Sequence, residues 1–266
     1  MHARVISTRW LTPNLVRVVL GGGDLPELEM PETTDTYVNV AIRPADAPYP
    51  EIFDPKAVCA EHERDLWPPR RRYTVRDWDG ATRRLTLDFV VHGPSGVGGP
   101  WAAAAQPGDV LVFEGPSGGY RPDPTADWHL MIGDESALPA IAASLEAVPP
   151  GVAVVVRLLC DGPEHEVDLA CLGILDLRWL HRSGGPGDAD LLSETIHDLH
   201  FPRGRVHAFV HGEADEIRRI RRHLLADRGL RREDMSCSPY WRRDMTDESW
   251  RQVKRDFVAA MEAEVA

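Results

Sequence analysis

Lysine is almost absent from this chain of 266 residues: Lys56 and Lys254 are the only two, and the other basic residues are arginines. So general a use of arginine makes any single arginine weak evidence for a binding site. Acidic residues outnumber basic ones by 42 to 30, which gives a formal net charge of −12. A chain of this charge is a poor match for nucleic acid or an anionic membrane surface, so we expect neither as a partner.

Long apolar runs are also missing. No stretch approaches the roughly 20 apolar residues that cross a bilayer, and Met1-His2-Ala3-Arg4 is not followed by the apolar core of a signal peptide. The four cysteines are widely spaced, at Cys59, Cys160, Cys171 and Cys237. This spacing fits neither a disulfide framework nor a zinc site and is typical of a reducing compartment. The histidine pairs His197/His200 and His207/His211 lack a cysteine or acidic partner at a fitting spacing. We therefore expect a cytoplasmic protein with no structural metal.

The rest of the composition is that of a folded protein, with 43% hydrophobic and 27% charged residues. The length leaves room for two domains, each with its own core. In the first part of the chain, short segments alternate apolar and polar side chains between turn residues: 3–11, 14–20, 37–42, 71–75, 85–91 and 110–113. Such closely spaced strands predict a small antiparallel β-barrel over residues 1–123. Residues 44–69 keep no sustained period, which predicts a surface loop with a short helix near 55–66.

The segment Arg71-Arg72-Tyr73-Thr74-Val75-Arg76 is the most informative of these strands. Within four residues it offers a permanent positive charge, an aromatic face and a hydroxyl. The planar guanidinium of an arginine is suited to holding a pyrophosphate, while a tyrosine can cover a planar ring and a threonine can reach a ring nitrogen. Taken alone, the segment also fits an ordinary exposed amphipathic strand.

A glycine-rich loop from His92 to Gly99 leads out of the strand at 85–91 into Pro100-Trp101-Ala102. Glycines allow backbone N–H groups to approach an anion, and a proline in the first turn starts a short helix whose free N–H groups favour phosphate. The alternative is a mobile glycine-rich loop without a ligand. Together with the strand at 71–76, the loop predicts the second half of a flavin-dinucleotide site.

The pattern changes after Pro122 and Pro124, which mark a linker at residues 120–126. From there apolar strands alternate with helices, which predicts an α/β domain with a mainly parallel sheet over residues 124–266. We expect strands at 129–132, 152–159, 177–180 and 206–210, and helices ending near 148, over 191–199 and over 213–228. A last helix should begin at Thr246 and bury Trp250, Val253 and Phe257.

Six short motifs occur in order along both predicted domains: Arg71-Arg72-Tyr73-Thr74-Val75-Arg76, Asp88-Phe89-Val90-Val91-His92-Gly93, Gly99-Pro100-Trp101-Ala102, Gly133-Asp134-Glu135-Ser136-Ala137-Leu138-Pro139-Ala140, His211-Gly212-Glu213 and Ser238-Pro239-Tyr240-Trp241-Arg242-Arg243. With these landmarks the chain resembles the siderophore-interacting protein family, FAD-dependent ferric-siderophore reductases related to ferredoxin reductases. The resemblance implies a flavin-binding barrel followed by a nicotinamide-binding α/β domain. It also implies reduction of Fe(III) to Fe(II) in a ferric siderophore, with NADH, NADPH or ferredoxin as the electron donor.

Carried over by position, the resemblance implies that Arg71 holds the FAD pyrophosphate, that Tyr73 lies against the isoalloxazine and that Thr74 approaches its N5. The further cofactor contacts would be Val75, Val90, Val91, His92, Gly99, Pro100, Trp101, Ala102 and Ser136. No general acid or base is expected, because the flavin itself carries the electron transfer.

Substrate contacts are expected near the C-terminus. A ferric siderophore is often anionic, so in a chain with a net charge of −12 its site needs local positive charge. The candidates are Arg242, Arg243 and Lys254, with Tyr240 and Trp241 covering the flavin face. Ordinary surface charge and core packing are the alternatives for these side chains. The chain departs from the family pattern at Asn39 and at Asp244-Met245, which points to a different siderophore charge or a different acceptor.

The acids of Gly133-Asp134-Glu135 stand where a dinucleotide-binding loop usually has glycines. They either cap the following helix or serve the site, and Glu213 is either a residue of the first turn of its helix or a site residue. Two other functions stay open at this point: a flavin-bearing carrier that reduces nothing on its own, and a flavin reductase for another acceptor.

Overall fold

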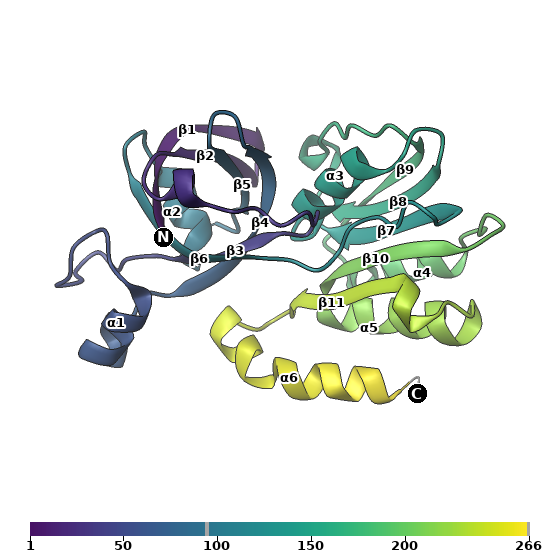
Figure 1. Ribbon diagram of the computed structural model, residues 1–266. Coiled ribbons are helices and arrows are strands. Elements are labelled where there is room, and N and C mark those ends of the chain that lie inside the picture. The colour runs from purple at the N-terminus through teal and green to yellow at the C-terminus, as the bar shows by residue number, and fades with distance from the viewer. Residues whose placement is uncertain (94–95, 265–266) are drawn as a thin grey trace. The chain divides into compact units, whose positions relative to one another are not determined.

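The computed structural model of the protein describes residues 1–93 and 96–264 (Figure 1). Pro94 and Ser95 of the predicted glycine-rich loop lie outside the described residues. The chain divides into two compact units, Met1–Tyr120 and Arg121–Ala266. Among the described residues, no helix combines the length and the apolar character that a membrane crossing requires.

The first unit is a closed barrel of antiparallel strands in the order β1-β2-β5-β4-β3-β6. Its strands are β1 (His2–Thr12), β2 (Leu15–Gly21), β3 (Tyr37–Ala41), β4 (Arg70–Asp79), β5 (Arg84–Val90) and β6 (Val110–Ser117). Two short helices accompany them, α1 (Pro55–Glu61) and α2 (Gly98–Ala104). The predicted barrel is confirmed, and closure pairs each of its described strands on both sides.

The interior of the barrel is filled by alternate residues of its strands, because successive side chains of a strand point to opposite faces. In β5, Leu85, Leu87 and Phe89 belong to one buried cluster. Val38 and Val40 of β3 join the same cluster. The barrel therefore has a hydrophobic core of its own, as the alternation in the sequence predicts.

The second unit is built on a parallel sheet in the order β11-β10-β7-β8-β9. Its strands are β7 (Trp128–Asp134), β8 (Ala153–Cys160), β9 (Ile174–His181), β10 (Val206–Glu213) and β11 (Met235–Trp241). Its helices are α3 (Leu138–Ala147), α4 (Leu191–His197), α5 (Ala214–Arg222) and α6 (Asp247–Ala263). The predicted α/β domain with a C-terminal helix is confirmed.

Helices cover both faces of this sheet. On one face, Trp128, Leu130 and Ile132 of β7 share a buried cluster with Leu192 of α4 and Ile217 of α5. The opposite face of β7 meets the start of α3, where a β-carbon at Gly133 would lie 2.6 Å from the β-carbon of Ala137, the N-cap residue of the helix. Burial on both faces explains why the sequences of the inner strands β7 and β8 are continuous apolar runs rather than alternating ones.

Strand β11 is not predicted by the sequence pattern, because Ser236, Ser238 and Pro239 interrupt its apolar character. The strand forms at the edge of the sheet, next to β10. An edge position tolerates Pro239, since one side of an edge strand needs no backbone donor. This strand carries the Ser-Pro-Tyr-Trp-Arg-Arg motif to the carboxyl end of the sheet.

Two helices differ in part from the prediction. The helix expected over 213–228 is α5, which ends at Arg222 and continues as one π-helical turn, His223–Asp227. In α6, which Thr246 caps, Trp250 and Phe257 are buried as predicted, but Val253 is 37% exposed. The prediction for Val253 is wrong because the inward stripe runs through Trp250, Phe257 and Met261, and Val253 lies beside it.

Candidate functional site

Strand β4 presents two faces with different chemistry. Tyr73 and Val75 face the barrel interior, where the ring of Tyr73 lies 4.1 Å from that of Phe89 between centroids. Arg71 shares this face by its spacing of two residues and is half-buried. Arg72, on the other face, is exposed, with its guanidinium 5.4 Å from the Tyr37 ring centroid. The structure thus separates two adjacent arginines into one interior-facing and one exposed residue.

Helix α2 begins directly against this strand. A β-carbon at Gly98 would lie 1.9 Å from the hydroxyl oxygen of Tyr73, and one at Gly99 would lie 2.9 Å from the carbonyl oxygen of Val90. Only glycine therefore allows the helix to start so close to both strands. Among the described residues, no side chain caps this helix, whose N-cap residue is Val97. Its first N–H groups are donors of the kind that bind phosphate.

The surroundings of Tyr73 fit an FAD molecule. A half-buried guanidinium and an uncapped helix start supply donors for a pyrophosphate. Tyr73 and Trp101 supply aromatic surface beside Phe89, whose ring centroid is 5.7 Å from that of Trp101. The close approach allowed by Gly98 brings the donors and the aromatic side chains to one place. Together, these residues could bind FAD.

The other predicted cofactor residues fall into three groups. Thr74, Val75, Gly99 and Ala102 are buried. Val90, Val91, Pro100 and Trp101 are half-buried, and His92 is exposed. Ser136 lies in the second unit, where its hydroxyl and its N–H both donate to Asp134.

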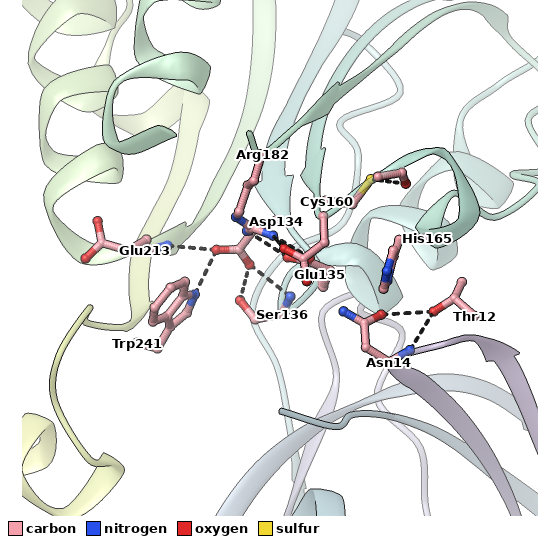
Figure 2. Close-up of polar contacts among 12 residues, drawn as sticks. Thr12, Asn14, Asp134, Glu135, Ser136, Cys160, His165, Arg182, Glu213 and Trp241 are labelled. Carbon is pink, nitrogen blue, oxygen red and sulfur yellow. Dashed lines mark hydrogen bonds and ion pairs between the residues drawn. The ribbon is translucent and has the colours of Figure 1, made fainter. Parts of the chain in front are cut away.

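The carboxyl end of the parallel sheet holds a second set of polar side chains, drawn in Figure 2. Asp134, at the end of β7, accepts hydrogen bonds through one oxygen from Ser136. Its other oxygen accepts from the backbone N–H of Glu213 at 3.0 Å and from the indole N–H of Trp241 at 2.8 Å. One buried carboxylate thus ties together the ends of β7, β10 and β11.

Glu135 forms a two-bond ion pair with Arg182, with oxygen–nitrogen distances of 2.5 and 2.9 Å. The same guanidinium donates to Asp161 at 2.8 Å. Burial raises the pKa of Glu135, and the bonds to Arg182 oppose that rise. Of the two alternatives for these acids, capping of the next helix does not hold, because the N-cap of α3 is Ala137 and no described side chain caps it.

Glu213 lies one residue before its helix rather than in the first turn. It is the N-cap of α5, accepting hydrogen bonds from the N–H groups of Asp215 and Glu216 at 2.9 and 3.0 Å. Its second oxygen accepts from the N–H of Arg243 at 3.1 Å. Burial, and secondarily the charge of Asp134, raises the pKa of Glu216 to about 8. The end of β10 therefore has a structural role in starting α5 and in holding the segment after β11.

Comparison with known proteins identifies both halves of the chain. Residues 4–120 match the model of the siderophore-interacting FAD-binding domain, and residues 126–244 match that of the siderophore-interacting protein. The chain belongs to the siderophore-interacting protein family. Its resemblance to that family, inferred from six short motifs, is confirmed.

Two curated relatives of this siderophore-interacting protein carry names of reductases. Ferric vibriobactin reductase ViuB of Vibrio cholerae is 33% identical over 94% of this chain and 92% of its own. The NADPH-dependent ferric-chelate reductase of Escherichia coli is 28% identical over 84% of this chain and 85% of its own.

Solved structures agree with the family assignment. A siderophore utilization protein from T. fusca is 36% identical, with a TM-score of 0.79 over 93% of this chain and 94% of its own. The siderophore-interacting protein SipS from Aeromonas hydrophila reaches a TM-score of 0.83 over 97% of this chain and 98% of its own. At 24% identity, SipS supports the fold alone.

The structure of this siderophore-interacting protein places the predicted substrate residues at the end of β11 and on α6. Tyr240 packs against His211, with ring centroids 4.9 Å apart, while Trp241 is 36% exposed. Arg242 pairs with Asp215 at 3.3 Å, and Arg243 is exposed.

Lys254 projects from α6 toward the same end of β11. It is half-buried. Burial lowers the pKa of His211 to about 3, and the positive charge of Lys254 lowers it further in the same direction. The five predicted substrate residues therefore gather around one strand end and the helix beside it.

Asp161 and Arg182 are polar residues at the sheet edge that the sequence analysis misses. Each directly follows an apolar strand, β8 and β9, and residues in that position of a parallel sheet reach its carboxyl end. Arg182 could not be identified as the residue after a strand, because β9 ends at His181 whereas the predicted strand ends at residue 180. Among the described residues, no group of three or more histidine, cysteine or acidic side chains is arranged to hold a metal ion.

Proposed function

We propose that this siderophore-interacting protein is an FAD-dependent oxidoreductase that reduces the iron of a ferric siderophore and so releases it. The observation that carries the proposal is the contact of Tyr73 with the start of α2, with the half-buried Arg71 two residues earlier on the same strand. The family supports it through its FAD-binding domain, and so do the two relatives named as ferric reductases.

In this proposal each part of the barrel site has one task. Arg71 and the first N–H groups of α2 bind the FAD pyrophosphate, and Tyr73 covers the isoalloxazine. Thr74, which follows Tyr73 on β4, supplies a group near N5. When bound, the flavin supplies the ability to accept two electrons as hydride and to pass them on singly, which is what a one-electron acceptor such as Fe(III) requires.

The α/β unit would bind the electron donor at the carboxyl end of its sheet, beside the switch in strand order between β7 and β10. The relative named for NADPH supports a nicotinamide donor. The ferric siderophore would meet Arg242, Arg243 and Lys254, and Arg242 would do so from a position that its ion pair with Asp215 holds. Positive charge is needed at this place, since the chain as a whole carries a net charge of −12.

Anaerobic stopped-flow absorbance with the purified protein loaded with FAD tests the proposal. The flavin absorption should bleach on mixing with NADH, NADPH or reduced ferredoxin. Addition of a ferric siderophore should then restore it, while a ferrous chelator collects the released iron. A flavin that stays oxidised with all three donors contradicts the reductase.

A flavin-bearing carrier that reduces nothing on its own is the second candidate. It is favoured by the two acids at the end of β7. Asp134 and Glu135 stand where a dinucleotide loop has glycines, and their carboxylates are bonded to Ser136, Trp241 and Arg182. The carrier would bind FAD and a siderophore while leaving the flavin oxidised in the same stopped-flow experiment.

A flavin reductase for another acceptor is the remaining alternative. Its flavin absorption would bleach normally with the donor, but ferric siderophores would stay unreduced in a panel of iron chelates.

A further inference from the structure

Strand β9 is an edge of the parallel sheet, because β8 alone pairs with it among the described strands (Figure 1). The N–H of Ile174 donates to the carbonyl of Val152, directly before β8, at 2.8 Å. The backbone groups of successive residues in a strand point to opposite sides of it, so the even-numbered residues of β9 bond to β8. The residues whose N–H and C=O groups point outward are Leu175, Leu177 and Trp179.

This edge is long and carries exposed apolar side chains. Ile174 is 67% exposed and Leu172 is 65% exposed, more than any other large hydrophobic residue that the structure describes. Strand β9 contains neither the proline nor the lysine with which proteins commonly protect an edge, whereas the opposite edge strand, β11, contains Pro239. An edge of this kind is a template for a further strand.

Two exposed charges of opposite sign lie on one face of β9. Asp176 accepts two hydrogen bonds from the buried Arg157 of β8, at 3.2 and 3.0 Å, and its side chain is 62% exposed. Arg178 is exposed and has no ion-pair partner within residues 1–93 and 96–264. Because the two residues are two positions apart in a strand, their side chains point to the same face.

A second copy of the chain can extend this edge in an antiparallel arrangement with two-fold symmetry. An axis at Leu177 sets Leu177 opposite its own copy and Leu175 opposite Trp179, so that outward backbone groups meet outward backbone groups. In this register Asp176 of each copy faces Arg178 of the other. These two form a non-hydrogen-bonded pair, in which facing side chains come closest.

The charges distinguish this register from its neighbours. An axis moved to position 176 would set Asp176 against Asp176, and an axis moved to position 178 would set Arg178 against Arg178. Like charges directly opposite each other destabilise a strand pair. The axis at Leu177 is therefore favoured, and it also sets the exposed Ile174 opposite the apolar Leu180.

We propose that the protein forms a symmetric dimer through β9, in which the parallel sheets of two copies continue each other. Such an interface is self-complementary, as a closed two-fold dimer requires. The pairing gives partners to the outward backbone groups of β9 and covers Ile174. The inference goes beyond the proposed function, because none of the residues assigned to FAD or to the siderophore lies on β9.

Sedimentation velocity of the purified protein with FAD added, from about 1 µM to about 1 mM, tests the dimer. The dimer fraction should rise with protein concentration over this range. A protein that stays monomeric up to about 1 mM overturns the inference, and it leaves the reductase of the proposed function intact.

Arg178→Glu creates two pairs of like charge across the interface and should raise the Kd of the dimer at least about tenfold. Arg203→Glu is the matched control, because Arg203 is also exposed and lies in the segment before β10, away from β9. The control should dimerise as the wild type does. Equal Kd values for the two variants contradict an interface at β9.

The double variant Asp176→Asn/Arg178→Glu tests the register. It removes the carboxylate that the new glutamate would face, while an amide oxygen remains to accept from Arg157. The double variant should therefore dimerise at least about threefold more tightly than Arg178→Glu alone. No recovery would contradict the pairing of position 176 with position 178.

Leu177→Pro removes the outward N–H at the two-fold axis and leaves the bonds of the even-numbered residues to β8 in place. It should abolish the dimer while circular dichroism and urea unfolding remain close to those of the wild type. A dimer that persists in this folded variant overturns the inference. Should the proline variant fold poorly, Arg178→Glu decides, since the Arg178 side chain is exposed.

Discussion

Arg71 and Arg72 are adjacent residues of the same type with opposite surroundings, which makes them a matched pair for mutation. We expect Arg71→Ala to weaken FAD binding at least about tenfold, because a hydrogen bond to a charged group contributes about 1.5–3 kcal/mol. Arg72→Ala should bind FAD as the wild type does, since Arg72 lies exposed on the other face of β4. The measurements are the flavin-to-protein absorbance ratio after purification and a titration of the protein freed of flavin.

Equal FAD affinity in the two variants would contradict the role given to Arg71. Urea unfolding of both variants without flavin serves as the control. It should show similar stability, because neither side chain belongs to the buried cluster of the barrel.

A second prediction at the scale of one residue concerns Glu216, whose pKa burial raises from 4.5 to about 8. Between these values the folded protein holds a proton that the unfolded chain has lost, so the free energy of unfolding falls as pH rises. Glu216→Gln should remove this decline and exceed the wild type in stability above pH 8 by about 1–3 kcal/mol. Below about pH 4 the two should converge, apart from any change in packing.

Urea unfolding from about pH 5 to about pH 9 measures this difference. Glu194→Gln is the control, because Glu194 is exposed on α4 and should leave the wild-type slope unchanged. A wild-type slope that persists in Glu216→Gln would show that another group causes it.

At the scale of the elements, Asp134 is the link between three strand ends. Trp241→Phe removes only the indole donor, so we expect it to lower the free energy of unfolding by about 0.5–1.5 kcal/mol. Asp134→Ala leaves the donors of Ser136, Glu213 and Trp241 without their acceptor and should cost on the order of 3 kcal/mol. Denaturant unfolding of the two single variants and the double variant measures both effects. Additive losses in the double variant would show that the Asp134–Trp241 bond does not contribute to stability.

Sequence patterns predict most of these elements because local and tertiary preferences agree. The alternation of Leu85, Leu87 and Phe89 identifies β5, and the apolar run at 152–159 identifies β8. Strand β11 could not be predicted, since its pairing with β10 rather than its own side chains makes it a strand. Val253 was misassigned because a helical pattern gives the spacing of an apolar stripe but not the direction from which its partner approaches.

The candidate site also contains some residues that sequence motifs predict and others that they do not. The residues of β4 and α2 could be predicted because their chemistry is concentrated in short motifs. Asp161, Arg182 and Glu135 are far apart in sequence and carry no motif, and only the parallel register of β7, β8 and β9 brings them together.

At the scale of the whole molecule, each unit has a separate hydrophobic core, so each can unfold on its own. We expect two transitions in differential scanning calorimetry of the protein without flavin. FAD at about 100 times its Kd should stabilise the barrel by about 2.7 kcal/mol and move only one transition. ADP-ribose should move the other.

Arg71→Ala identifies the barrel transition, because FAD at the same concentration should no longer shift it fully. One transition that responds to both ligands would contradict independent units. A shift of the same transition by FAD and by ADP-ribose would contradict the division of binding sites between them.

The glycines at the start of α2 have a consequence for any attempt to diversify this protein. A side chain at position 98 would collide with the Tyr73 hydroxyl, and one at position 99 with a backbone carbonyl. In a saturation library selected for yellow colonies, both codons should stay glycine, although neither residue has a side chain to offer a ligand. Such invariance would reflect the close packing of the first turn of α2 against β4 and β5. In an alignment of the surviving sequences, the two glycines would resemble ligand-binding residues although their conservation is steric.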